Sequence, residues 1–207
     1  MKDRVRERYA SQVDGLRTLG GLVAILWVVE IVNALDSYRL DNDGIVPRSV
    51  AHLDGIVFAP FLHASFGHLL SNTVPFVILG AAIALAGARR LLFVSLIAAL
   101  VSGAGTWLTA PGGTVTVGAS GVVFGYATYL ISRGVFNRKI AELGLGLVVL
   151  VVFGGALVYD LIPHTGISWE AHLFGGIGGV LAAAAVARER PTKTSKASLP
   201  ARARVQS

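Results

Sequence analysis

A serine, three histidines and an asparagine stand out in this 207-residue chain because they lie inside or beside strongly apolar stretches: His63, His68, Asn72, Ser120 and His172. A serine hydroxyl becomes a good nucleophile when a base removes its proton, and an imidazole is the commonest such base. Polar side chains within membrane segments are costly and tend to mark function. These residues therefore predict nucleophilic catalysis, with Ser120 as the nucleophile and His172 as the general base.

The composition places these residues in a membrane protein. Hydrophobic residues make up 54% of the chain and charged residues only 14%, and the charges cluster between long apolar runs. A soluble domain of this size needs more charge on its surface. The net charge of +6 does not predict nucleic-acid binding, because no basic stripe interleaves with aromatic residues. The chain has no cysteine, which excludes a disulfide framework and a thiolate metal site. The predicted surroundings are a lipid bilayer.

Six apolar stretches predict an all-α bundle of six transmembrane helices. The predicted spans are 19–35, 68–88, 91–108, 118–132, 143–161 and 171–187. The fourth is the shortest, at roughly 15 residues or about 22 Å. The segment before it, 106–117, is rich in Gly, Thr and Pro, so it cannot face lipid and must contact protein or water. We therefore expect the fourth helix to begin below the membrane surface.

Basic residues set the expected orientation. With a cytoplasmic N-terminus, 16 of the 18 Lys and Arg residues fall inside, and only Arg39 and Arg48 fall outside. The expected organisation is a basic cytoplasmic segment (1–18), a membrane domain (19–187) and a disordered basic cytoplasmic tail (188–207) in the cell membrane. An alternative is a signal peptide cleaved after Val32-Asn33-Ala34, but the long preceding region and the internal Glu30 disfavour it.

This topology brings the polar residues to one depth. Spans two, four and six all run from outside to inside, and His68, Ser120 and His172 lie at their outer ends. Glycines follow on the same helical faces: Gly121 and Gly125 after Ser120, and Gly175, Gly176 and Gly179 after His172. Small residues at this spacing let membrane helices approach closely, which would bring the hydroxyl to the imidazole. Phe124, one turn below Ser120, is placed to cover the imidazole ring.

The remaining requirements are oxyanion donors and water. The first backbone N–H groups of the fourth helix are one source of donors. His68 and Asn72, at i and i+4, are expected to add side-chain donors from the second helix. The polar outer rim, including His63, Ser65 and residues 114–116, is expected to line the path for water. No acidic residue is clearly placed to orient His172, since Glu170 faces another side of the helix, so a dyad is expected.

Two alternatives concern the same residues. A lone serine in an apolar helix is often a packing residue or bonds to its own backbone. His63, His68 and His172 could instead bind zinc, but no acidic ligand is nearby and no H-E-x-x-H pattern occurs. The prediction is therefore a serine-type enzyme that does not bind zinc at these histidines.

Three motifs in this order resemble those of the rhomboid family of intramembrane serine proteases. His63 to Asn72 resembles its H-x-x-x-x-H-x-x-x-N motif, and Gly118-Ala-Ser120-Gly121 resembles its G-x-S-G motif. The third, from Ala171 through His172 and Gly175 to Gly179, resembles A-H-x-x-G-x-x-x-G. The resemblance covers approximately residues 19–187.

The resemblance implies a six-helix protease that cleaves single-span membrane proteins near the outer face, with Ser120 and His172 as a dyad and without metal or cofactor. It implies that His68, Asn72 and the Ser120 amide stabilise the oxyanion, that Gly118 shapes the turn, and that His63 supports water access. It also implies an aromatic residue, here Phe124, stacked on the histidine. One departure is that the first loop lacks the Trp-Arg pair of many members. The rival functions are a non-enzymatic relative that binds membrane helices, and a small transporter or channel, although no repeated half-structure supports the latter.

Overall fold

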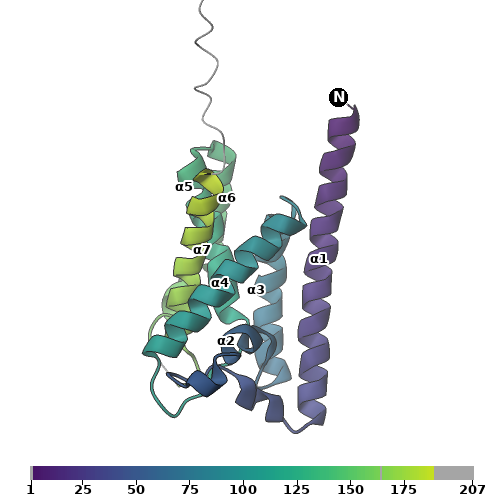
Figure 1. The fold of residues 1–207 in the computed structure, drawn as a ribbon. Coiled ribbons are helices and arrows are strands. Elements are labelled where there is room, and N and C mark those ends of the chain that lie inside the picture. Colours follow the sequence, from purple (N-terminus) through teal and green to yellow (C-terminus); the bar gives the residue numbers. More distant parts are fainter. Residues whose placement is uncertain (1, 164, 189–207) are drawn as a thin grey trace, which may run out of the picture.

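The computed structural model describes residues 2–163 and 165–188, which fold into a bundle of helices (Figure 1). The long helices are α1 (Lys2–Leu35), α3 (Phe66–Ala84), α4 (Ala88–Thr109), α5 (Ser120–Asn137), α6 (Ile140–Tyr159) and α7 (Trp169–Arg188). The loop between α1 and α3 contains four short helices: η1 (Arg39–Asp43), η2 (Val50–His52), α2 (Gly55–Phe58) and η3 (Ala59–Phe61). The predicted all-α bundle with six long helices is confirmed.

Five of the long helices, α1, α3, α4, α6 and α7, are long and apolar enough to cross a membrane. They identify the chain as a multi-pass membrane protein. Helix α5, which corresponds to the fourth predicted span, is not among them. It is the central helix, in contact with α3, α4, α6 and α7, and most of its residues are buried. A helix shielded from lipid in this way can contain tyrosine, threonine and glycine without facing hydrocarbon.

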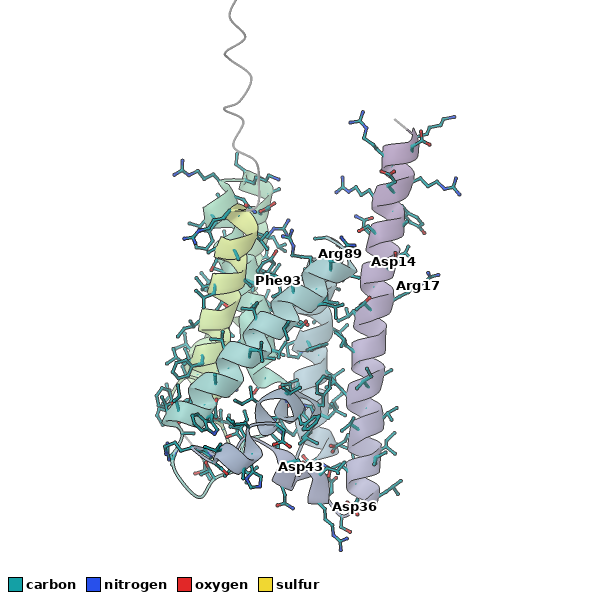
Figure 2. All side chains as sticks on the ribbon, in the orientation of Figure 1. Asp14, Arg17, Asp36, Asp43, Arg89 and Phe93 are labelled. Carbon is teal, nitrogen blue, oxygen red and sulfur yellow. The ribbon has the colours of Figure 1, made fainter. Side chains whose placement is uncertain are left out.

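Successive long helices run in alternating directions, so the start of α1 and the end of α7 lie at the same end of the bundle (Figure 1). The beginnings of α3, α5 and α7 gather at the opposite end. Figure 2 shows the same division, with Arg17 and Arg89 toward the first end and Asp36 and Asp43 at the second. The three helix ends that carry His68, Ser120 and His172 therefore share one end of the molecule.

Helix α1 is longer than the apolar pattern predicts. The expected span 19–35 forms only its second half, because the helix begins at Lys2. Lys, Arg, Glu and Ala in the first turns are good helix formers and favour this continuation. Gly15 packs on the backbone of Ala84 at the end of α3, where no side chain would fit. The predicted tail 188–207 lies outside the described residues, except for Arg188.

Helices α5 and α7 touch backbone to backbone along their glycines. A Cβ atom added to Gly175 would lie 2.7 Å from the carbonyl carbon and 2.9 Å from the Cα of Gly121. One turn further, Gly179 lies equally tightly against the backbone of Gly125. The Thr128 hydroxyl of α5 donates a hydrogen bond of 2.7 Å to the Gly176 carbonyl of α7. This contact fixes the spacing of the two helices that carry Ser120 and His172.

Candidate active site

Ser120 is the first residue of α5 and is held by the turn before it. Gly118 has a φ of +123°, a conformation that disfavours any side chain, and its N–H donates to the Ala59 carbonyl at 2.8 Å. The next N–H, that of Ala119, donates to His63 Nε2 at 3.3 Å. Because the first N–H groups of a helix have no partner within the helix, the backbone around Ser120 also offers hydrogen-bond donors.

His172 lies in the first turn of α7, across from Ser120. The Ser168 hydroxyl accepts a hydrogen bond from the Ala171 N–H at 3.3 Å and so caps the start of the helix. The imidazole is stacked on the Phe124 ring of α5, with centroids 4.3 Å apart and planes 4° apart. Stacking and burial hold the imidazole in one plane, since His172 is only 4% exposed.

Both ring nitrogens of His172 have a partner. Nε2 lies 2.8 Å from Ser120 Oγ, and Nδ1 lies 2.9 Å from the backbone carbonyl of Asp160. A carbonyl only accepts hydrogen bonds, so Nδ1 carries the proton of the neutral ring and Nε2 is left as the acceptor of the Ser120 hydroxyl. This geometry allows Nε2 to take the hydroxyl proton.

The Asp160 carbonyl was not foreseen from the sequence. The side-chain pattern offers no acid that orients His172, and the Glu170 carboxylate accepts a hydrogen bond from the Ser168 hydroxyl. The end of helix α6 is the feature that could have indicated this contact. The last carbonyls of a helix lack partners within the helix, and those of α6 lie beside the start of α7.

His68 and Asn72 lie one turn apart on α3, on the side facing Gly118. Ser65 caps this helix by accepting from the His68 N–H at 3.1 Å, which fixes where the helix begins. A Cβ on Gly118 would lie 2.9 Å from both Cε1 and Nε2 of His68 and 3.6 Å from Asn72 Nδ2. Only a glycine therefore lets both side chains reach the turn before Ser120. Among the described atoms, the buried Asn72 Nδ2 has no hydrogen-bond partner.

A cavity of about 880 Å³ connects these groups, and it is lined by Ser120, His172, His68, Asn72 and Gly118. Its walls include residues 110, 111 and 114–118 before α5 and residues 163 and 166–171 around the start of α7. The cavity is thus bounded by polar and apolar loop residues at the end of the bundle where α3, α5 and α7 begin. It is large enough to admit water and a peptide segment to Ser120.

His63 does not line this cavity and is fully buried behind it. Its ring packs edge to face on His68, with centroids 5.1 Å apart. Burial, with the nearby His68 adding to it and the Phe61 carbonyl opposing it, lowers the pKa of His63 to about 4. His63 is therefore neutral at physiological pH, and its Nε2 accepts a hydrogen bond from the backbone before Ser120. Its part in water access stays a prediction.

The first loop is anchored although it lacks the Trp-Arg pair. The Arg48 guanidinium donates to the carbonyls of Leu108 and Ala110 at 3.3 and 2.8 Å. Trp107, which belongs to α4, donates from its indole to the Ser49 carbonyl at 3.1 Å. A two-way backbone bridge between Ile45 and Thr116 adds to these contacts. The loop is thus attached to the segment that leads to Ser120.

Among the described residues, no group of three or more His, Cys, Asp or Glu side chains is arranged to hold a metal ion. Of the three histidines that could have bound zinc, His172 contacts Ser120, whereas His63 and His68 pack on each other beside the turn before Ser120.

Comparison with known proteins identifies the family. The family model of the rhomboid domain matches residues 50–189. An uncharacterized protein of Mycobacterium tuberculosis is 41% identical over 180 residues, which cover 83% of this chain and 75% of the relative. An uncharacterized protein of Mycobacterium leprae is 38% identical over 189 residues, 86% of this chain and 74% of the relative. A Bacillus subtilis protein named "Putative rhomboid protease YdcA" is 28% identical over 165 residues, 77% of this chain and 82% of that protein. The chain belongs to the rhomboid family of intramembrane serine proteases.

Proposed function

We propose that this protein is an endopeptidase that hydrolyses peptide bonds in or near the transmembrane helices of single-span membrane proteins, with Ser120 and His172 as a catalytic dyad. The observation that carries the proposal is the 2.8 Å contact between Ser120 Oγ and His172 Nε2, with Nδ1 bound to a backbone carbonyl. Nε2 removes the hydroxyl proton as Oγ attacks the scissile carbonyl, and it later returns the proton to the leaving amine.

The developing oxyanion would be bound by His68, Asn72 and the Ser120 N–H. The free donor on Asn72 supports this role, because a buried amide N–H group without a partner is costly unless a ligand takes it. The peptide product remains on Ser120 as an ester until a water molecule, reaching the ester through the cavity, hydrolyses it with His172 again acting as the base.

The distribution of basic residues indicates which side of the membrane each end of the bundle faces. Most of the basic residues that the structure describes lie at the end where α1 begins, so we propose that this end and the C-terminus face the cytoplasm. The active site then lies toward the extracytoplasmic side, within reach of substrate helices that enter from the bilayer of the cell membrane.

The test is cleavage of a model transmembrane substrate by the purified protein in liposomes, followed on gels. Ser120→Ala and His172→Ala are each expected to lower cleavage by roughly 1,000-fold or more, because each removes half of the dyad. Ser71→Ala is the matched control. Ser71 lines the same cavity, but its hydroxyl donates to the His68 carbonyl, so activity should stay near wild type.

Full cleavage by Ser120→Ala would refute the proposal. A non-enzymatic relative would bind the substrate helix without cutting it and would not react with a fluorophosphonate, whereas the proposed dyad is labelled at Ser120. A transporter or channel would produce flux in liposomes that is indifferent to Ser120→Ala.

A further inference from the structure

Helix α1 contains a buried acid that the proposed chemistry does not use. Glu30 is 0% exposed, and neither of its carboxyl oxygens has a hydrogen-bond partner among the described residues. Carboxyl groups within membrane helices face the protein interior and are kept when they serve a function. The position of Glu30 indicates which group it serves.

The neighbours of Glu30 show which way it faces. Trp27, Glu30 and Asn33 are spaced three apart and share one face of α1. The Trp27 ring packs near Phe66, with centroids 6.4 Å apart. Asn33 donates to the His63 carbonyl at 3.3 Å and to Asp41 Oδ1 at 2.8 Å. Glu30, which lies between two residues that contact the 63–66 segment, therefore faces that segment as well.

His63 has an unpaired hydrogen-bond donor that a carboxyl group could accept. Its Nε2 accepts from the Ala119 N–H, so the proton of the neutral ring is on Nδ1. That buried Nδ1–H has no hydrogen-bond partner among the described residues. An unpaired donor on His63 and an unpaired acceptor on Glu30 thus lie on facing segments, and buried polar groups of this kind are rarely left unpaired.

Asp41 is the other acid at this site, but it is already engaged, because its Oδ1 accepts from Asn33. The Phe61 carbonyl lies close to the His63 ring but does not form a hydrogen bond of acceptable geometry with Nδ1. Glu30, whose carboxyl lies near the Asn33 amide without forming a well-aligned hydrogen bond to it, remains as the acceptor for the His63 proton.

We propose that the Glu30 carboxyl accepts the hydrogen bond of His63 Nδ1–H through one buried water, and so fixes the tautomer that binds the Ala119 N–H. Glu30 is then a positioning residue, acting through His63 and the backbone before Ser120. The proposal rests on the proposed function of Ser120 as the nucleophile. It gives α1, which lies outside the catalytic helices, a part in setting the active site.

The test uses the full chain in detergent micelles with ¹⁵N-labelled histidine, and the His63 signals are assigned with His63→Gln. In the wild type we expect His63 with its proton on Nδ1. Glu30→Leu removes the acceptor at nearly constant size, so we expect a mixture of tautomers and a roughly tenfold lower kcat with KM within about twofold. Glu30→Gln keeps an acceptor oxygen, so it should rescue activity while the Nδ1–H signal shifts.

Leu26→Ala is the matched control, because Leu26 is also buried on α1 but has no polar group. It is expected to lower stability without changing the His63 tautomer. A wild-type His63 tautomer in Glu30→Leu would overturn the proposal, as would equal losses of kcat in Glu30→Leu and Leu26→Ala. If Glu30→Leu does not fold, an unchanged Nδ1–H signal in Glu30→Gln overturns it. The tautomer is measured without substrate, so failure of the proposed protease function would be seen separately, as cleavage by Ser120→Ala.

Discussion

The contact between Gly175 and Gly121 allows a direct test of how closely the two catalytic helices must approach. The perturbation is Gly175→Ala, a single methyl group that would lie 2.7 Å from the Gly121 carbonyl carbon and 2.9 Å from its Cα. Every close neighbour of that methyl is backbone, so no side chain can move aside to make room. The helices themselves must separate.

The size of the separation follows from these distances. Carbon atoms in contact prefer about 3.5–4.0 Å, so α5 and α7 must move apart by about 1 Å at this level. Ser120 precedes Gly121 directly, and His172 is one turn before Gly175. The 2.8 Å contact between Oγ and Nε2 would lengthen to about 3.8 Å, beyond hydrogen-bonding distance. A misplacement of about 1 Å is enough to lower a catalytic rate roughly 100-fold.

The assay is the rate of fluorophosphonate labelling of Ser120, which needs an activated serine but no helical substrate, together with cleavage of the model substrate. We expect both rates to fall roughly 100-fold in Gly175→Ala. Gly144→Ala on α6 is the matched control, because a Cβ at Gly144 meets nothing within 4 Å. Labelling and cleavage at wild-type rates in Gly175→Ala would refute the argument that glycine packing sets the Ser–His distance.

Four further predictions concern the surroundings of the dyad. Phe124→Leu removes the ring stacked on His172 and should lower kcat by about 2- to 13-fold, whereas Phe124→Tyr should keep it. Gly118→Ala should abolish labelling of Ser120, because its φ of +123° and the nearby His68 leave no room for a methyl group. Folded His63 has a pKa of about 4 against 6.5 when unfolded, so the unfolded state binds the extra proton between these pH values. The free energy of unfolding should therefore fall by about 3 kcal/mol as the pH drops from 6.5 to 4, measured by chemical unfolding in micelles, and His63→Gln should remove this dependence. Arg48→Ala should lower the free energy of unfolding by about 1 kcal/mol in the same assay, with Arg39→Ala as an exposed control.

The features of the fold that depend on repeated side-chain properties could be predicted from the sequence. Apolar runs gave the long helices, and the glycines after Ser120 and His172 indicated which helices touch. The start of α1 was missed because the apolar pattern begins only at Leu19, whereas helix propensity continues back to Lys2. Hydropathy indicates which residues lie in the lipid bilayer, but it does not indicate where a helix begins.

The parts of the site made by backbone could not be predicted in the same way. The Asp160 carbonyl and the Ala119 N–H exist in any sequence, and only the fold brings them to His172 and His63. The anchor of the first loop was missed for a related reason. The tryptophan expected within that loop is absent, and Trp107 of α4 contacts it from the neighbouring helix.

The contacts before Ser120 explain why the first loop belongs to the site. Three residues of the chain that enters α5 are bound to the first loop: Thr116 pairs with Ile45, the Gly118 N–H binds the Ala59 carbonyl, and the Ala119 N–H binds His63. Helix α5 has no side-chain cap of its own at Ala119. Its first residue is therefore held from outside the helix, by the first loop on one side and by His172 on the other. A side-chain cap would occupy the free N–H groups at the start of the helix. Because Ser120 is held by the first loop and His172, these N–H groups stay available for an oxyanion.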